Sequence, residues 1–390
     1  MRWLSLSLIL PMILLGAAFV PRTIPLGAAF ASRMSATETL SWSVQTTGRD
    51  TNLRGASIAF SSLAKRPADP MVWFSGSNGT ILRSDDLGVS WTALHVAGAE
   101  ALDFRGIVAL DYQTAYAMSS GEGDKSRIYK TADGGATWKL QYSGTRSEIF
   151  LDSIACTSSG NSFGTASSAA PRRSAIKCYA LGDPVDGKFL LLRSDDGATW
   201  KELPRDAMPA ALPGEGAFAA SGTCIALGPA NENGGEILFG TGGTGARGPR
   251  VFRSSDGGIT WMVAETPLAH GNPSSGIFSV VRLPGDGVVA VGGDYKDPNG
   301  AKTVAAYSRD RGATWHLAAQ QPGGFRSAVG VREGLKLLAL GTNGEDASDD
   351  GGIHWRHLAS LELNTLAIAS GANAWAAGPK GTIARLTISK

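Results

Sequence analysis

The sequence predicts an all-β protein, a seven-bladed β-propeller of four-stranded blades, and three observations support this prediction. A motif, Ser-x-Asp-x-Gly-x-Thr-Trp, occurs six times in the 390 residues, with its tryptophans 40 to 62 residues apart. Each copy follows a similar unit of three short apolar segments joined by turns. The two ends of the chain carry the parts of one further unit. Repeats of this length with four short strands are typical of propellers, in which each blade buries its faces against its neighbours.

The motif is predicted to form a tight turn between the third and fourth strands of a blade. Its Asp and Ser/Thr side chains can accept backbone N–H bonds within the turn, and its Gly can take the positive φ that the turn requires. It resembles the Asp-box, also called the bacterial neuraminidase repeat. Because backbone N–H groups use these carboxylates, we expect structural rather than catalytic or metal-binding roles for them. The carboxylates belong to Asp86, Asp133, Asp196, Asp256, Asp310 and Asp350.

The two chain ends predict how the ring closes. Residues 381–385 (GTIAR) repeat residues 79–83 (GTILR), which form the third strand of the first unit. The C-terminal unit has no copy of the motif and therefore lacks a fourth strand. Residues 42–48 (WSVQTTG) match residues 138–144 (WKLQYSG), which begin at the last residue of the second copy. We therefore expect a single domain over residues 40–390 in which the N-terminal strand completes the C-terminal blade and removes both exposed sheet edges.

Residues 1–31 are predicted to be a signal peptide. Arg2 precedes an apolar segment, residues 4–20, and an Ala-x-Ala site lies at residues 29–31. An uncleaved anchor is the less favoured alternative, because the apolar segment is shorter than the roughly 20 residues of a membrane span. We therefore expect an exported protein, periplasmic or secreted. The chain has 36 basic and 34 acidic residues, and two of the basic ones lie in this segment. Without a basic excess to displace counterions, we expect no nucleic-acid binding.

The three cysteines predict one disulfide in an exported chain. Cys156 and Cys178 flank a Ser-, Ala- and Gly-rich insertion and lie at the ends of two segments that should pair as a hairpin. We expect these two to be bonded, and the alternative is two buried thiols that never meet. Cys224 is expected to be a small core residue, because no His lies near it in the sequence.

The face opposite the motif turns is the predicted functional surface. Alignment of the inner strands puts the following residues at equivalent positions around the central opening: Arg54, Arg105, Asp152, Glu215 or Gly216, Ser275 or Gly276, Arg326 and Asn364. The loops between second and third strands add Asp183, Asp186, Arg247, Asp294 and Tyr295. Guanidinium groups suit carboxylates and phosphates, so three arginines among carboxylates predict a site for an anion or a peptide. The alternative is that these residues form ion pairs that seal the seams between blades.

Across nearly the whole chain, the sequence resembles the photosystem II stability/assembly-factor family, in its non-photosynthetic bacterial branch. Beside the motif copies, the resemblance rests on FRGI (104–107), GDPVDGKF (182–189), GEGAFAASGT (214–223), TGGTGAR (241–247), GIFSV (276–280), GGDY (292–295) and FRSAV (325–329). It implies an exported propeller scaffold or assembly/stability factor that binds a protein or a small acidic ligand. In the photosynthetic members an arginine-rich face docks a membrane-protein precursor, and Arg54, Arg105 and Arg326 would match that face. We accordingly expect a monomer with a protein partner, for which a membrane-protein client is one candidate.

A sialidase-like or other glycoside hydrolase is the alternative function. Sialidases carry the same turns, and they need three arginines, a Tyr nucleophile with an acidic partner and an Asp acid. Arg54, Arg105, Arg326, Tyr295 and Asp294 could supply that set. However, the first inner strand reads Leu-Arg-Gly-Ala at residues 53–56, not Phe/Tyr-Arg-Ile-Pro, so we favour a scaffold without enzymatic activity. The sequence has no P-loop, no dinucleotide-binding glycine motif and no zinc-spaced Cys/His set, so we expect no cofactor and no metal.

Overall fold

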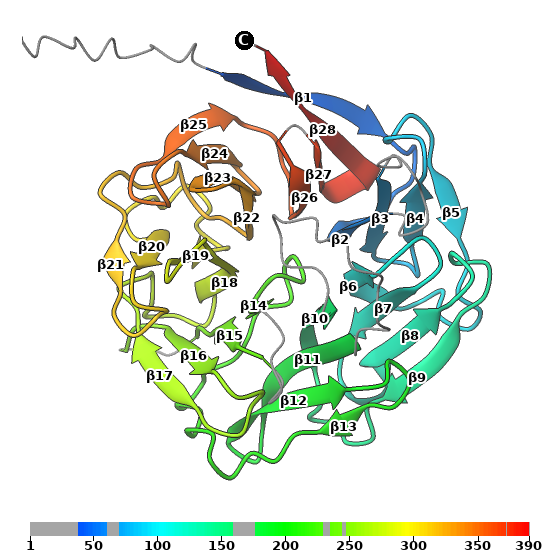
Figure 1. Ribbon diagram of the computed structural model, residues 1–390, viewed down its shortest axis with the longest axis horizontal. Coiled ribbons are helices and arrows are strands. Elements are labelled where there is room, and N and C mark those ends of the chain that lie inside the picture. Colours follow the sequence, from blue (N-terminus) through cyan, green and yellow to red (C-terminus); the bar gives the residue numbers. More distant parts are fainter. Residues whose placement is uncertain are drawn as a thin grey trace, which may run out of the picture. The chain divides into compact units, whose positions relative to one another are not determined.

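The strands of the protein form seven four-stranded antiparallel sheets, arranged as blades around a ring (Figure 1). The computed structural model describes residues 38–60, 70–158, 176–228, 235–243, 247–371 and 373–389. The predicted signal peptide lies outside these described residues. In this part of the chain no helix is both long enough and apolar enough to span a membrane. The prediction of an all-β, seven-bladed propeller is confirmed.

Blades 1 to 6 follow one another along the chain, each from its inner to its outer strand. Blade 1 contains β2 (Leu53–Ala59), β3 (Met71–Gly76), β4 (Ile81–Ser84) and β5 (Thr92–Leu94). Blade 2 contains β6 (Asp103–Ala109), β7 (Ala115–Ser120), β8 (Arg127–Thr131) and β9 (Lys139–Ser143). Blade 3 contains β10 (Leu151–Ser158), β11 (Ile176–Val185), β12 (Lys188–Ser194) and β13 (Lys201–Glu202).

The second half of the ring repeats this order. Blade 4 contains β14 (Ile225–Leu227), β15 (Ile237–Gly240), β16 (Arg250–Ser254) and β17 (Met262–Glu265). Blade 5 contains β18 (Ser275–Arg282), β19 (Val288–Asp294), β20 (Ala305–Ser308) and β21 (His316–Leu317). Blade 6 contains β22 (Ala328–Glu333), β23 (Lys336–Gly341), β24 (Gly344–Ser348) and β25 (Arg356–Ala359). Blade 7 contains β26 (Thr365–Ser370), β27 (Asn373–Ala377), β28 (Thr382–Ser389) and β1 (Thr39–Thr46). Two single 3₁₀ turns, η1 (Gly123–Lys125) and η2 (Pro379–Gly381), lie in loops.

The core lies between the blades. Every residue of the second strands β3, β7 and β15 is buried, whereas the outer strands β5 and β13 are mostly exposed. A strand buried on both faces reads as a continuous apolar run rather than an alternating one, as MVWFSG does in β3. Trp73 of blade 1, for example, is fully buried in one cluster with Phe104 of blade 2. Each blade is therefore stabilised by its two neighbours.

The N-terminal strand closes the ring, as the sequence predicts. Strand β1 pairs antiparallel with β28 from Thr39↔Ser389 to Thr46↔Thr382, and Figure 1 shows the blue strand beside the red one. Leu40 is buried, and it packs in the core of blade 7 with Leu386 and Leu363. The strand thus contributes apolar contacts as well as backbone hydrogen bonds.

The repeated turns use their carboxylates internally, and the first copy shows how. The Ser84 hydroxyl and the Ser90 N–H donate to Asp86 Oδ1 at 2.8 and 2.9 Å, and the Ser90 hydroxyl donates to Oδ2 at 2.6 Å. The hydrogen bond from the Ser90 side chain is the largest of the effects that lower the pKa of Asp86 to about 2. The Gly88 N–H in turn donates to Ser84 Oγ at 2.8 Å. The Asp86 carboxylate therefore accepts hydrogen bonds from donors within its own turn.

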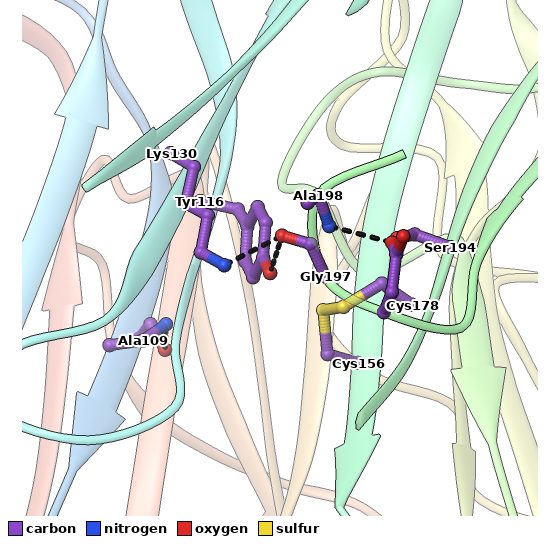
Figure 2. Close-up of a disulfide and its surroundings, with 10 residues drawn as sticks. Ala109, Tyr116, Lys130, Cys156, Cys178, Ser194, Gly197 and Ala198 are labelled. Carbon is purple, nitrogen blue, oxygen red and sulfur yellow. Dashed lines mark hydrogen bonds between the residues drawn. A yellow bond between two sulfur atoms is a disulfide. The ribbon is translucent and has the colours of Figure 1, made fainter. Parts of the chain in front are cut away.

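Cys156 and Cys178 lie directly opposite each other in the β10–β11 hairpin, and their sulfur atoms are bonded (Figure 2). The same view shows a link between blades 2 and 3, where the Gly197 carbonyl accepts from the Tyr116 hydroxyl and the Lys130 ammonium, both at 2.7 Å. The third cysteine, Cys224, is buried and free.

Removal of the closing strand should destabilise the whole ring. Deletion of residues 41–47 exposes β28 as an edge, so we expect aggregation or a melting temperature many degrees lower. A milder change, Leu40→Ala, should cost about 2–4 kcal/mol of unfolding free energy because it opens a cavity in blade 7. Val44→Ser is the matched control, since this side chain of β1 is 50% exposed. If the deletion protein and Leu40→Ala were both as stable as the wild type, β1 would not dock on blade 7.

Peptide mapping without reductant should recover Cys156 joined to Cys178. Burial raises the pKa of the Cys224 thiol, so an alkylating reagent should reach it only after unfolding. A bridge that contains Cys224 would contradict the hairpin register.

Candidate ligand-binding face

The register of the inner strands defines which residues are equivalent around the axis. In blades 1, 2 and 3 a bulge at the start of the inner strand holds Arg54, Arg105 and Asp152. The same hydrogen-bond pattern puts Phe278, Ser327 and Asn364 at this place in blades 5, 6 and 7. These six residues are called the axial positions below. The sequence alignment differs from them in three blades: it placed Glu215 or Gly216 in blade 4, Ser275 or Gly276 in blade 5 and Arg326 in blade 6, and the reason is the local register.

Arg326 does not occupy an axial position. Its N–H bonds to the Gly292 carbonyl of the preceding blade, as the N–H of Leu53 bonds to Gly378, so Arg326 is equivalent to Leu53 rather than to Arg54. A shift of one residue turns a strand side chain to the opposite side. Arg326 is accordingly 0% exposed, and its Nε donates to Asp346 at 2.6 Å. The predicted ring of three arginines is therefore corrected to two arginines and one buried ion pair.

A segment that leads into blade 4 crosses the central opening. Residues 216–224, here called the central segment, hydrogen-bond to five other blades, and Figure 1 shows the green chain before β14 near the middle of the ring. The Ser153 hydroxyl donates to Gly222 O at 2.6 Å and the Thr365 hydroxyl donates to Ser221 O at 3.1 Å. Arg105 Nη1 donates to Ala219 O at 3.3 Å. The sequence alignment of blade 4 through Glu215 or Gly216 fails because this segment replaces a regular inner-strand start.

Arg54 and Arg105 lie close together beside this segment. Arg105 Nε donates to Asp103 Oδ2 at 2.7 Å. None of the hydrogen bonds or ion pairs formed by the described residues engages the Arg54 guanidinium. Burial, and then repulsion from Arg105, lower the pKa of Arg54, while Asp103 acts in the opposite direction. The arrangement leaves a partly buried guanidinium with unused donors, which a carboxylate ligand would satisfy.

Two carboxyl groups lie behind Arg105. Asp152 is 1% exposed, and its Oδ2 has no hydrogen-bond partner among the described residues. Burial first, and then the charge of Asp183, raise the pKa of Asp152 well above its ordinary value, against the opposing effect of Arg105. Burial also raises the pKa of Asp183, although its Oδ1 accepts the Ala217 N–H at 2.9 Å. Burial therefore disfavours the charged form of both carboxyls.

The opposite side of the central segment is aromatic, which the sequence analysis missed. The Phe218 and Phe278 rings stack with their centroids 3.9 Å apart, and Phe325 lies edge-on to Phe278 at 4.7 Å. Tyr295, 47% exposed, lies edge-on to Phe278 at 6.1 Å. A signal for Phe278 was present in the sequence, namely the glycine near the end of the second strand. In blade 5 this glycine is Gly292, which pairs with Ile277, and the bulged residue that follows Ile277 is Phe278.

Three predicted site residues have structural partners instead. Glu215 is buried against Arg250, whose Nε donates to it at 2.8 Å. Asp186 has a φ of 53° in the β11–β12 hairpin turn and accepts from Arg146 at 3.2 Å, beside a pocket of about 390 Å³ that Arg146 also lines. Arg247 lies 3.5 Å from Glu265 at the outer strand of blade 4. Within the described residues, these three do not converge on the axial arginines.

The sialidase-like set does not assemble. Arg326 is fully buried, so it cannot meet a ligand together with Arg54 and Arg105. Asp294 is held in its loop by Asn272 Nδ2 and by the Lys296 N–H, both at 2.9 Å. Burial opposes ionisation of Asp294, but hydrogen bonds, chiefly from Ser274, outweigh it and lower the pKa. Among the described residues no group of three or more His, Cys, Asp or Glu side chains could hold a metal ion.

The fold defines the class of this protein as a seven-bladed β-propeller, and a chain segment crosses the centre of the ring. Solved structures of the same fold include "YCF48 bound to D1 peptide", with a TM-score of 0.58 and 14% identity over 88% of this chain and 96% of that one. YCF48 from Cyanidioschyzon merolae gives a TM-score of 0.57 and 16% identity over 88% and 98% of the two chains. In sequence, the chain matches no protein-family model and no curated protein. At these identities the likeness shows the fold.

The buried carboxyl of Asp152 predicts a pH effect on stability. Its pKa is raised in the folded state, so its contribution is fully present below the unfolded value of about 3.9 and is lost as the pH rises through the folded value. We expect the melting temperature of Asp152→Asn to exceed that of the wild type by a margin that grows from pH 5 to pH 9 and reaches several degrees. Asp86→Asn is the control, because a carboxyl with a pKa of about 2 adds no slope in this range. Parallel wild-type and Asp152→Asn curves would contradict this assignment.

Proposed function

We propose that the protein is an exported scaffold or assembly factor that docks an acidic polypeptide segment at Arg54 and Arg105, without turnover. Residues 1–31 would direct export, and the six Asp-box turns would serve the fold alone. The proposal keeps the predicted face and narrows it to blades 1 and 2 beside the central segment.

One observation carries the proposal, namely that the Arg54 guanidinium has no hydrogen-bond or ion-pair partner among the described residues. Partial burial of a charged group is costly unless it is paired, and the like charge of Arg105 increases that cost. A carboxylate between the two arginines would supply the missing acceptor and relieve the repulsion. The fold does not need a charged residue at this position, because Ser327 and Asn364 occupy the equivalent axial positions in blades 6 and 7. The unfavourable burial of Arg54 therefore favours a role in ligand binding.

The comparison with solved propellers supports a polypeptide ligand. A YCF48 structure of the same fold was solved with a D1 peptide. Propellers of one fold host many functions, so the choice of an acidic segment here depends on the local chemistry of Arg54 and Arg105.

Fluorescence anisotropy with a labelled Glu-rich decapeptide would test the site. We expect binding that weakens with salt and falls about tenfold or more in Arg54→Ala and in Arg105→Ala, because each removes hydrogen bonds between charged groups. The unfolding free energy of Arg54→Ala should stay within about 1 kcal/mol of the wild-type value, since the substitution strands no partner among the described residues.

Two arginine variants serve as controls. Arg356→Ala removes the same charge from outer strand β25, where the side chain is 43% exposed, and should leave binding unchanged. Arg326→Ala should cost about 3–5 kcal/mol of stability, because it leaves Asp346 buried without its partner. Equal peptide binding by Arg54→Ala, Arg105→Ala and the wild type would disprove the docking site.

A further inference from the structure

The central surface has two chemically different halves. Arg54 and Arg105 occupy the axial positions of blades 1 and 2, whereas Phe278 occupies that of blade 5. The central segment runs between the two halves. Ala219 accepts the hydrogen bond from Arg105, and its neighbour Phe218 stacks on Phe278. The residue that contacts Arg105 and the residue that begins the aromatic stack are therefore adjacent in the chain, with their Cα atoms about 3.8 Å apart.

The aromatic half is built for a ring at this place. Phe218 lies over Gly242 and Gly276, and a Cβ at either glycine would collide with its ring. Glycine permits this close approach of backbone and ring. Phe278 and Phe325 are both 2% exposed and fix the stack from below, while Phe218 is half-buried and Tyr295 is exposed. Phe218 and Tyr295 can therefore offer apolar contact to a ligand, and little side-chain entropy is lost on binding because the buried rings already hold them in place.

We propose that the polypeptide recognised at the arginines carries an aromatic or large aliphatic side chain a few residues from its acidic group, and that this side chain docks against Phe218 and Tyr295. This inference rests on the proposed function, because the arginines define one end of the bound segment. The adjacency of Phe218 and Ala219 limits the spacing between the two ligand groups to a few residues. The occupant is a peptide, because one polypeptide segment can present both a carboxylate to the arginines and an apolar side chain within that spacing.

A peptide panel would test this inference. The probes are fluorescein-labelled decapeptides of Gly and Ser that carry a Glu-Glu pair and one Phe, placed one to six residues away, each with a matched peptide in which Ala replaces Phe. We expect at least one spacing at which the Phe peptide binds about tenfold more tightly than its Ala partner. Tyr295→Ala should reduce that preference severalfold, and Tyr295→Phe, which keeps the ring, should retain it.

The variants separate this inference from the proposed function. Arg54→Ala should weaken the Phe and Ala peptides by the same factor, because it removes only the carboxylate contact. Equal affinity of Phe and Ala peptides at every spacing would overturn the aromatic contact and leave arginine docking intact. Failure of the wild type to bind any of the acidic peptides would overturn both. Preference for Phe that persists in Tyr295→Ala and in Phe218→Leu would also overturn the inference, because the side chain would then dock elsewhere.

Discussion

Each blade of this ring buries its faces against its two neighbours, so the ring depends on the pairing of β1 with β28, which joins the two ends of the chain. Eight residue pairs connect the two ends of the chain, from Thr39↔Ser389 to Thr46↔Thr382. Without them, blade 7 would end in an exposed edge and lose the apolar contacts of Leu40. The closure also brings together segments that are far apart in the chain, and pairing of such distant segments is entropically costly. The ring therefore depends on a contact that forms only when the chain is nearly complete.

The central segment adds a second constraint at the axis. It fills the opening around which the inner strands gather, and its Ser221, Gly222 and Thr223 bond to blades 3, 5, 6 and 7. The proposed ligand surface therefore includes this segment as well as the starts of the inner strands. On that surface the axial residues differ from blade to blade, so charge collects on one side and aromatic rings on the other. This asymmetry, within a symmetric fold, gives the central surface two chemically different halves.

The charged groups near the axis fall into two energetic classes. Arg326 and Glu215 are buried with partners, Asp346 and Arg250, and removal of one partner would strand the other. Arg54 is only partly buried and lacks such a partner among the described residues. The first class stabilises blades, whereas the second is free to meet a ligand. Residue type alone does not separate these classes, since both contain arginine.

The sequence by itself determined the architecture, because that information is local and repeated. The motif turns, the three apolar segments before each turn, and the match of GTIAR with GTILR are enough to predict seven blades and closure by the N-terminal strand. The site was predicted only in part. Arg54, Arg105, Asp152 and Asn364 were aligned correctly, whereas Arg326 was displaced by one residue and Phe278 was overlooked. Only the tertiary structure decided these positions, because a shift of one residue reverses the side of a strand that faces the axis, and because the path of the central segment depends on hydrogen bonds with five other blades.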